Sequence, residues 1–372
     1  MTDRVAHDLR AIAVAEGLSG FGICTAEPFE DVRVSIEERK AGGLAGRLTF
    51  TFANPERSTD VRSSFPWARR LVVGAAPYVA DSGSPSLRTA REGRIARFAT
   101  RDAYAPLRQA LGSIAEHLRA RGHEAEVLVD DNRLVDRGAG VRAGVGWWGK
   151  NTMVLAPGVG PWLLLGSVVT DTPLETTGPM LRTCGTCSAC LPACPTGALI
   201  GPGILDARRC LAAIVQAPGV IPREYREAIA DRIYGCDDCL EACPPGRRHL
   251  LNAGGSRAGI VDLPTILRSS DRTILDRYGH FYIPRRQARY LRRNALVAIG
   301  NTGDSSFVSL LAGYVAHPDW LLRLHSAWAL GRIGGPFAIA ILKAAQRQEV
   351  HDEVREEIAL DLRELRGHEQ VR

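Results

Sequence analysis

The sequence has few of the features that mark export or membrane insertion. Its first residues include Asp3, Arg4 and Asp8 and lack the apolar core of a signal peptide, and no twin-arginine pair is near them. The longest apolar stretch, 159–169, is interrupted by glycine and proline and is too short to span a bilayer. We therefore expect a cytoplasmic protein with no membrane partner.

Several nucleotide-binding and hydrolase motifs are also missing. There is no Walker A run and no serine in a G-x-S-x-G segment. Residues 138–143 match the dinucleotide pattern G-x-G-x-x-A, but a polar loop precedes them where a buried strand is needed. We do not expect a nicotinamide site. The composition is that of an ordinary globular chain, with 45% hydrophobic and 24% charged residues, and the net charge of +6 permits a polyanionic partner.

The nine cysteines are the most informative residues. In a reducing compartment, their number favours metal binding or redox chemistry over disulfides. Residues 184–195 follow the ferredoxin pattern C-x2-C-x2-C-x3-C-P, in which three thiolates hold one 4Fe–4S cluster and the fourth reaches another. Residues 236–244 supply the last three positions of a second copy. Ile233 stands where its first cysteine would be, and Cys210 is the nearby candidate to replace it.

These spacings predict two four-thiolate sites. The ligand sets are Cys184, Cys187, Cys190 and Cys243 for the first cluster, and Cys194, Cys210, Cys236 and Cys239 for the second. The alternatives are a pair of zinc sites or buried structural cysteines. Zinc usually takes its ligands from two CxxC-type pairs and has no need of a third close cysteine followed by x3-Cys-Pro, so the spacing favours clusters. Only Cys24 is left over, and we interpret it as a packing residue.

Hydrophobic periodicity divides the chain into three segments, which predict a multidomain α/β, ferredoxin-like and helical-repeat protein. Residues 1–175 are expected to form an α/β domain, with helices at 3–16 and 104–121 and strands at 21–23, 71–76, 125–129 and 163–170. The ferredoxin-like module with both clusters follows at 176–252. After a Gly/Ser-rich joint at 253–259, residues 260–372 are expected to be helical.

The helical segment contains an internal repeat. Residues 292–300 and 323–331 superpose with an offset of 31 residues, and a third copy begins near Val354. An arginine followed by a small-residue, apolar helix that ends in glycine is typical of HEAT-like repeats. A plain helical cap is the alternative.

Basic residues cluster at the start of this repeat domain. On one continuous helix their spacing would place them in a single stripe that could bind phosphates, although most charge runs are solvated faces. The five residues are Arg285, Arg286, Arg289, Arg292 and Arg293.

The chain resembles the cobalamin-dependent epoxyqueuosine reductases of tRNA modification over almost its whole length. The resemblance rests on the cysteines in family order and on four further segments. These are Arg137-x4-Arg142-Ala143-Gly144-x-Gly146-Trp147-x-Gly149-Lys150-Asn151-Thr152, Leu205 to Cys210 with Ile233 to Cys239, and Arg293-Asn294-Ala295-x3-Ile299-Gly300-Asn301.

The resemblance implies cobalamin bound in the N-terminal domain without a histidine ligand to cobalt, and no Asp-x-His-x-x-Gly segment is present. It also implies Asp130 as the catalytic proton donor beside cobalamin, with Arg57, Lys150 and Asn151 as candidate contacts to the corrin side chains. The surrounding loop departs from the family pattern. In this loop Asp131 replaces a hydroxyl residue and Arg133 replaces a proline. Elsewhere, Ala103 and Ala105 replace the acid and the histidine of an Asp-Tyr-His motif, of which only Tyr104 is kept. Pro245-Gly246 replaces the Trp-Asn that follows the last cysteine.

Three functions are compatible with these patterns. The first is a reductase that converts epoxyqueuosine to queuosine in tRNA, in which the clusters pass single electrons to cobalamin. The second is a paralogue that reduces another substrate, as the related reductive dehalogenases do. The third is a non-catalytic ferredoxin-like carrier fused to a binding repeat. For the first we expect a monomer that binds the anticodon region of queuosine-type tRNAs and receives electrons from a flavodoxin or ferredoxin.

Overall fold

A computed structural model describes residues 2–79, 89–253 and 259–370. Contacts divide the chain into two units: Met1–Ser84, Arg101–Cys210 and Asp237–Arg257 form the first, and Pro85–Thr100, Leu211–Cys236 and Ala258–Arg372 form the second. The predicted joint at 253–259 falls mostly on residues outside this description. No helix in the described ranges has both the length and the apolar character that crossing a membrane requires.

The first unit is built on a four-stranded antiparallel sheet with the order β1-β2-β7-β4. Its strands are β1 (Gly20–Thr25), β2 (Arg70–Pro77), β4 (Ala125–Val129) and β7 (Leu163–Thr170). These are the strands that the sequence predicted. Every residue of β7 is buried, because both faces of this central strand are covered.

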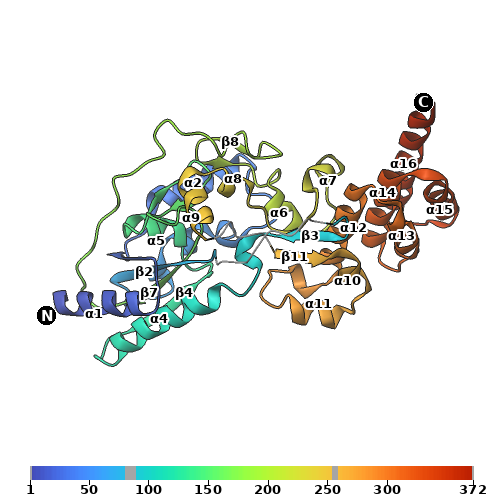
Figure 1. Ribbon diagram of the computed structural model, residues 1–372. Coiled ribbons are helices and arrows are strands. Elements are labelled where there is room, and N and C mark those ends of the chain that lie inside the picture. Colours follow the sequence, from blue (N-terminus) through green and yellow to red (C-terminus); the bar gives the residue numbers. More distant parts are fainter. Residues whose placement is uncertain (1, 80–88, 254–258, 371–372) are drawn as a thin grey trace. The chain divides into compact units, whose positions relative to one another are not determined.

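Helices cover opposite faces of the sheet. Successive residues of a strand point to opposite faces. Gly166 of β7 faces Leu111 of α4 (Tyr104–Arg119), whereas the neighbouring Leu165 faces Gly140 of α5 (Asp136–Arg142). Helix α1 (Thr2–Ala15) packs beside α4, and Figure 1 shows these two helices together on one side of the sheet. Gly138 and Gly140 therefore serve close packing of α5, since a Cβ at either would crowd apolar neighbours.

The first unit also contains shorter elements, some of which carry candidate site residues. They are α2 (Glu30–Ala41), α3 (Pro55–Thr59), the hairpins β5 (Trp147–Trp148) with β6 (Val154–Leu155) and β8 (Leu199–Gly201) with β9 (Ile204–Leu205), and α8 (Asp238–Glu241) and α9 (Pro244–Asn252).

The second unit contains a three-stranded sheet of the order β10-β3-β11. The strands are β3 (Glu92–Ile95), β10 (Arg232–Tyr234) and β11 (Gly259–Asp262), and β3 pairs parallel to β10 and antiparallel to β11. This pairing explains why residues 85–100 belong to the second unit. The predicted cysteine module, 176–252, is consequently shared between the two units.

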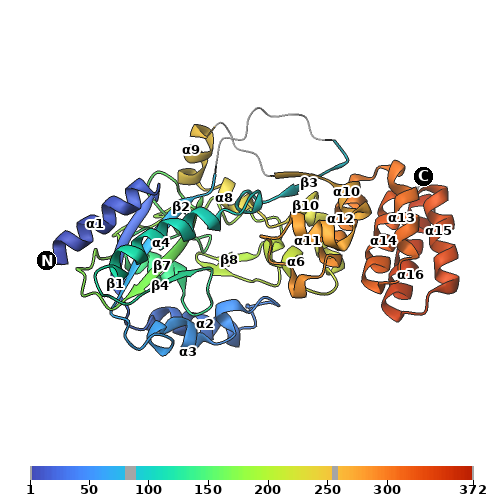
Figure 2. The same ribbon diagram turned by 90° about the horizontal axis from the view of Figure 1, so that it is seen from below.

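Helices make up most of the second unit. They are α6 (Leu211–Gln216), α7 (Arg223–Ile229), α10 (Leu263–Arg268), α11 (Asp271–Arg277), α12 (Arg289–Thr302), α13 (Val308–Val315), α14 (Trp320–Ile333), α15 (Gly335–Gln348) and α16 (Asp352–Gln370). The two repeats found in the sequence lie on α12 and α14, and the third copy begins on α16. Helix α14 packs against both α12 and α16, and Figure 2 shows α13 to α16 side by side, as stacked helical repeats require.

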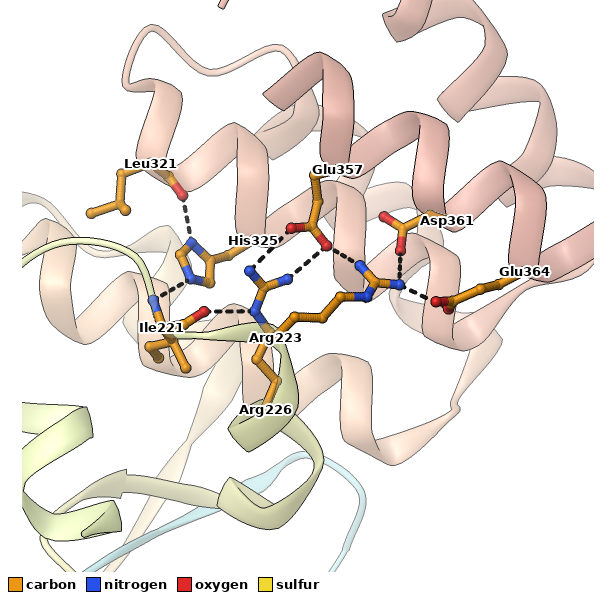
Figure 3. Close-up of polar contacts among 8 residues, drawn as sticks. All are labelled: Ile221, Arg223, Arg226, Leu321, His325, Glu357, Asp361 and Glu364. Atoms are coloured by element: carbon orange, nitrogen blue, oxygen red, sulfur yellow. Dashed lines mark hydrogen bonds and ion pairs between the residues drawn. The ribbon is translucent and has the colours of Figure 1, made fainter. Parts of the chain in front are cut away.

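A buried ion-pair network joins α7 to the last helix of the second unit (Figure 3). Arg226, whose side chain is 1% exposed, donates to both carboxylate oxygens of Glu357 at 2.8 and 3.1 Å. Arg223 also pairs with Glu357 and donates to Asp361 at 2.7 Å. His325 lies beside them, accepting from the N–H of Ile221 at Nε2. The network ties residues more than 130 positions apart in sequence.

Candidate active site and iron–sulfur centres

The first cysteine run lies in a chain of tight turns rather than in a regular element. Backbone N–H groups of Cys187, Leu191 and Cys194 donate to carbonyls three residues earlier, at 3.1, 3.0 and 3.3 Å. These turns present the thiols one after another, and all nine cysteines are free of disulfides.

The structure brings Cys243 to the first three cysteines of the run. Burial, with smaller contributions from negative charge on Cys184, Cys190 and Cys187, raises the pKa of the Cys243 thiol to about 11. Burial also raises the pKa of Cys190, with added effects from Cys184 and Cys187. Thiols that repel one another as thiolates need a bound cation to hold them together, so these four residues fit a metal–sulfur cluster.

The loop that holds Cys194 is tied to the loop that precedes Cys210. The hydroxyl of Thr196 donates to the carbonyl of Arg209 at 2.6 Å, and the guanidinium of Arg209 donates back to the carbonyl of Thr196 at 2.6 Å. Burial alone would raise the pKa of Cys194, but backbone N–H groups that include Ala198, 3.2 Å from the sulfur, lower it. A stabilised thiolate is what a cluster ligand requires.

The second set remains a prediction as a whole. Cys239 lies on α8 in the first unit, whereas Cys236 is the last residue of the second unit's segment Leu211–Cys236. Within the described residues, no three His, Cys, Asp or Glu side chains form a group that could hold a single metal ion.

The predicted proton donor Asp130 follows strand β4 directly. Its backbone has φ of 53°, a left-handed conformation that is uncommon for a residue other than glycine. The next residues form a turn in which the N–H of Leu134 donates to the carbonyl of Asp131 at 3.2 Å. Leu134 is fully buried and Val135 nearly so, which anchors the turn to the core. The strand end and this anchor together fix where Asp130 lies.

The surroundings of Asp130 make its carboxyl a weaker acid than a free aspartate. Desolvation raises the pKa of Asp130, and the charge of Asp131 adds to this rise, while Arg108 and Arg137 oppose it. The residue is exposed as a whole, so solvent screens part of these charge effects. Asp131 differs, because hydrogen bonds from Arg133 lower its pKa. Of these two neighbouring carboxyl groups, Asp130 is therefore the better proton donor.

Asp136 is a residue whose importance the sequence reasoning missed. It begins α5, and burial raises its pKa well above the ordinary value, with further contributions from the charges of Asp130 and Asp131. Its Oδ1 atom is buried and has no hydrogen-bond partner within the described part of the chain.

The candidate corrin contacts occupy three different environments. Arg57 lines an open pocket of about 460 Å³ with Arg133. The ammonium of Lys150 donates to the carbonyl of Gly185 at 2.7 Å and so lies at the first cysteine run. Asn151 is 4% exposed; its Oδ1 accepts from the N–H of Met153. Its Nδ2 is a buried donor for which the described residues offer no acceptor. An amide or phosphate oxygen of cobalamin would satisfy that donor, so this residue fits the cofactor.

The expectation of one arginine stripe on a helix was wrong. Arg285 and Arg286 lie in a 3-10 turn with φ of 51° and 52°, and α12 begins only at Arg289. Arg293 is 1% exposed and donates to the carbonyls of Ala217 and Gly219.

The other two arginines of α12 have acidic partners. Arg292, 9% exposed, pairs with Asp271 and donates to the carbonyl of Ser269. Arg289 pairs with Asp319 at 3.3 Å. Of the five, Arg285 and Arg286 are exposed, and Arg286 also donates to the carbonyls of Gly279 at 3.2 Å and Leu275 at 3.0 Å.

The fold and the grouped thiols define an iron–sulfur oxidoreductase that carries a helical-repeat domain. Residues 183–246 match the model of the 4Fe-4S double cluster binding domain, and residues 284–363 match that of HEAT repeats, which confirms both predicted modules. The epoxyqueuosine reductase of Bacillus cereus is 31% identical over 367 residues, covering 96% of each chain. This chain belongs to the epoxyqueuosine reductase family.

Solved structures agree with this assignment. A crystal structure of selenomethionine-labelled epoxyqueuosine reductase has a TM-score of 0.90 at 28% identity and covers 98% of this chain and 100% of its own. Another, of epoxyqueuosine reductase with an epoxyqueuosine-modified tRNA-Tyr stem loop, has a TM-score of 0.87 at 26% identity and the same coverage. The predicted fold class is thereby confirmed.

Proposed function

We propose that this protein reduces epoxyqueuosine to queuosine in tRNA, with electrons supplied through two 4Fe–4S clusters and with cobalamin as the cofactor. The observation that carries the proposal is the family membership together with Asp130, an acid of raised pKa at the end of β4 in the same unit as the first four thiols. A relative binds a tRNA stem loop that carries this nucleoside. The family relationship and the double-cluster match support an enzyme rather than a carrier.

The reaction takes two electrons and two protons: the two carbon–oxygen bonds of the epoxide break, an alkene forms, and the oxygen leaves as water. The chemistry that bound cobalamin supplies is the two-electron reduction of the epoxide. An external one-electron donor, such as a flavodoxin or ferredoxin, provides the electrons singly. Asp130 donates one proton to the leaving oxygen, because desolvation raises the pKa of its carboxyl and so favours the protonated form. Solvent supplies the second proton.

Binding of the partners falls to separate residues. Asn151 would hold a polar side chain of the corrin through its unpaired Nδ2, and Arg57 and Lys150 remain candidates for further contacts. The exposed Arg285 and Arg286 are candidates for tRNA phosphates.

The test is anaerobic reconstitution with iron, sulfide and cobalamin, followed by incubation with a chemical reductant and tRNA that carries epoxyqueuosine. Mass spectrometry of the digested tRNA should show conversion to queuosine only when cobalamin is present. Conversion without cobalamin would refute the cofactor, and the absence of conversion with both cofactors loaded would refute the substrate.

A further inference from the structure

We infer that Arg133 is a positioning residue: with Asp131 it forms an ion-pair clip that holds the Asp130 loop in place and sets the acidity of the proton donor. The inference rests on the proposed role of Asp130. Both members of the clip are positions at which this chain departs from the family pattern.

The contacts of the clip are extensive for two residues so close in sequence. Asp131 Oδ1 accepts from the backbone N–H of Arg133 at 2.8 Å and from its Nε at 2.9 Å. Asp131 Oδ2 accepts from Nη2 of Arg133 at 2.6 Å. The carboxylate thus closes an Asx turn and grips the guanidinium with two parallel bonds. The side chains are 26% and 32% exposed, so the pair is only partly open to solvent.

Arg133 is also held from its other side. Its guanidinium carbon lies 5.0 Å from the ring centroid of Phe65, a cation–π contact. It lines the open pocket that also contains Arg57. A long side chain fixed at both ends restrains the turn much as a proline would. The left-handed backbone of Asp130, which immediately precedes this turn, is thereby kept in place.

The clip has an electrostatic consequence for Asp130. Three charged groups act on that carboxyl, Arg108 of α4, Asp131 in the turn and Arg137 of α5, and the titratable carboxyl of Asp136 also interacts with it. Asp131 is the one that Arg133 neutralises directly. Without Arg133, the negative charge of Asp131 would stand uncompensated beside the donor. Without Asp131, the positive charge of Arg133 would stand uncompensated near the donor.

Removing Arg133 and removing Asp131 should therefore shift the pKa of Asp130 in opposite directions. Arg133→Gln should raise the pKa of Asp130 by about 0.5 to 1 unit and Asp131→Asn should lower it by a similar amount, whereas the double variant, which removes both charges, should titrate near the wild type. Arg133→Lys keeps the charge and should leave the pKa near that of the wild type. The measurement is a 13C NMR titration of aspartate-labelled protein with its clusters oxidised, in which the Asp130 signal is identified by its loss in Asp130→Asn.

A matched control exists in the same unit. Asp206 and Arg208 form a clip of the same geometry, with contacts of 3.0, 2.9 and 2.8 Å. Asp206, unlike Asp131, is not among the charges that shift the pKa of Asp130, so a change in its arginine partner has no carboxylate through which to act on Asp130. Arg208→Gln should therefore leave the Asp130 titration unchanged.

Two results would overturn the inference: shifts of the same sign in both single variants, or no shift in either. A variant that fails to fold shows broad, undispersed signals, and the comparison then rests on Asp131→Asn and Arg133→Lys. The alkaline limb of single-turnover activity should follow the same order as the NMR titration. If the Asp130 pKa values shift as predicted but the activity profiles do not follow them, the role of Arg133 is supported and the proposed role of Asp130 as proton donor is refuted.

Discussion

Replacing Glu357 with glutamine should destabilise the second unit far more than its single atom change suggests. The residue is buried and neutralises Arg226, whose side chain is 1% exposed. Glutamine keeps the shape and can still accept a hydrogen bond, but it leaves the arginine charge without its counterion. Breaking a buried pair in this way costs about 3 to 5 kcal/mol. We expect about 3 kcal/mol, because Asp361 still pairs with Arg223.

Differential scanning calorimetry at neutral pH should detect the loss. At about 2 to 4 °C per kcal/mol for a unit of this size, Glu357→Gln should lower the Tm of the transition that contains the helical repeats by roughly 6 to 12 °C. Glu364→Gln is the control, since that carboxylate contacts the same Arg223 but is 57% exposed. Its effect should stay below about 1 kcal/mol.

The same structure makes a prediction for the double variant. Arg226→Leu with Glu357→Leu removes both charges, and an apolar pair of similar bulk often replaces a buried ion pair without loss. It should recover most of the stability lost in Glu357→Gln. Equal losses for Glu357→Gln and Glu364→Gln would show that burial of the network does not determine its contribution.

Anaerobically purified protein should contain about eight iron atoms; Cys194→Ala or Cys210→Ala should retain about half, and Cys24→Ala should retain all of it because this buried thiol packs in the sheet. Full iron in Cys210→Ala, or bound zinc, would refute the ligand sets. Arg285→Gln with Arg286→Gln should weaken tRNA binding and reduce the salt slope by about one unit per lost contact, whereas Arg293→Gln should lower the Tm instead. An unchanged slope in the first pair would remove these arginines from the tRNA interface.

The sequence predicted the regular elements well where hydrophobic patterns are strong. The four strands of the first sheet, helix α4 and the repeat helices α12 and α14 all appear near their predicted positions. Strand β3 was missed, because Glu92–Ile95 is short and charged and is stabilised by pairing with strands more than 130 residues away. Long-range pairing of this kind leaves no local pattern.

The site was predictable in its chemistry and less so in its contacts. Cysteine spacing identified the thiols that the structure brings together, because ligand spacing in these loops is fixed by the cluster. The prediction of one arginine stripe was wrong because it required a single continuous helix. Arg285 and Arg286 have positive φ angles, so the backbone is not helical there. The raised pKa of Asp136 and the Asp131–Arg133 clip depend on three-dimensional neighbours, which the periodicity of the sequence does not reveal.

The most direct test of the account is a single-turnover comparison of wild-type protein with Asp130→Asn on tRNA that carries epoxyqueuosine. The amide preserves shape and removes the transferable proton, so conversion should slow by roughly 10² to 10⁴ while iron and cobalamin contents stay unchanged. Parallel variants Asp131→Asn and Asp136→Asn should lose less activity. Normal turnover by Asp130→Asn, with loss in Asp131→Asn instead, would contradict the assignment of the proton donor.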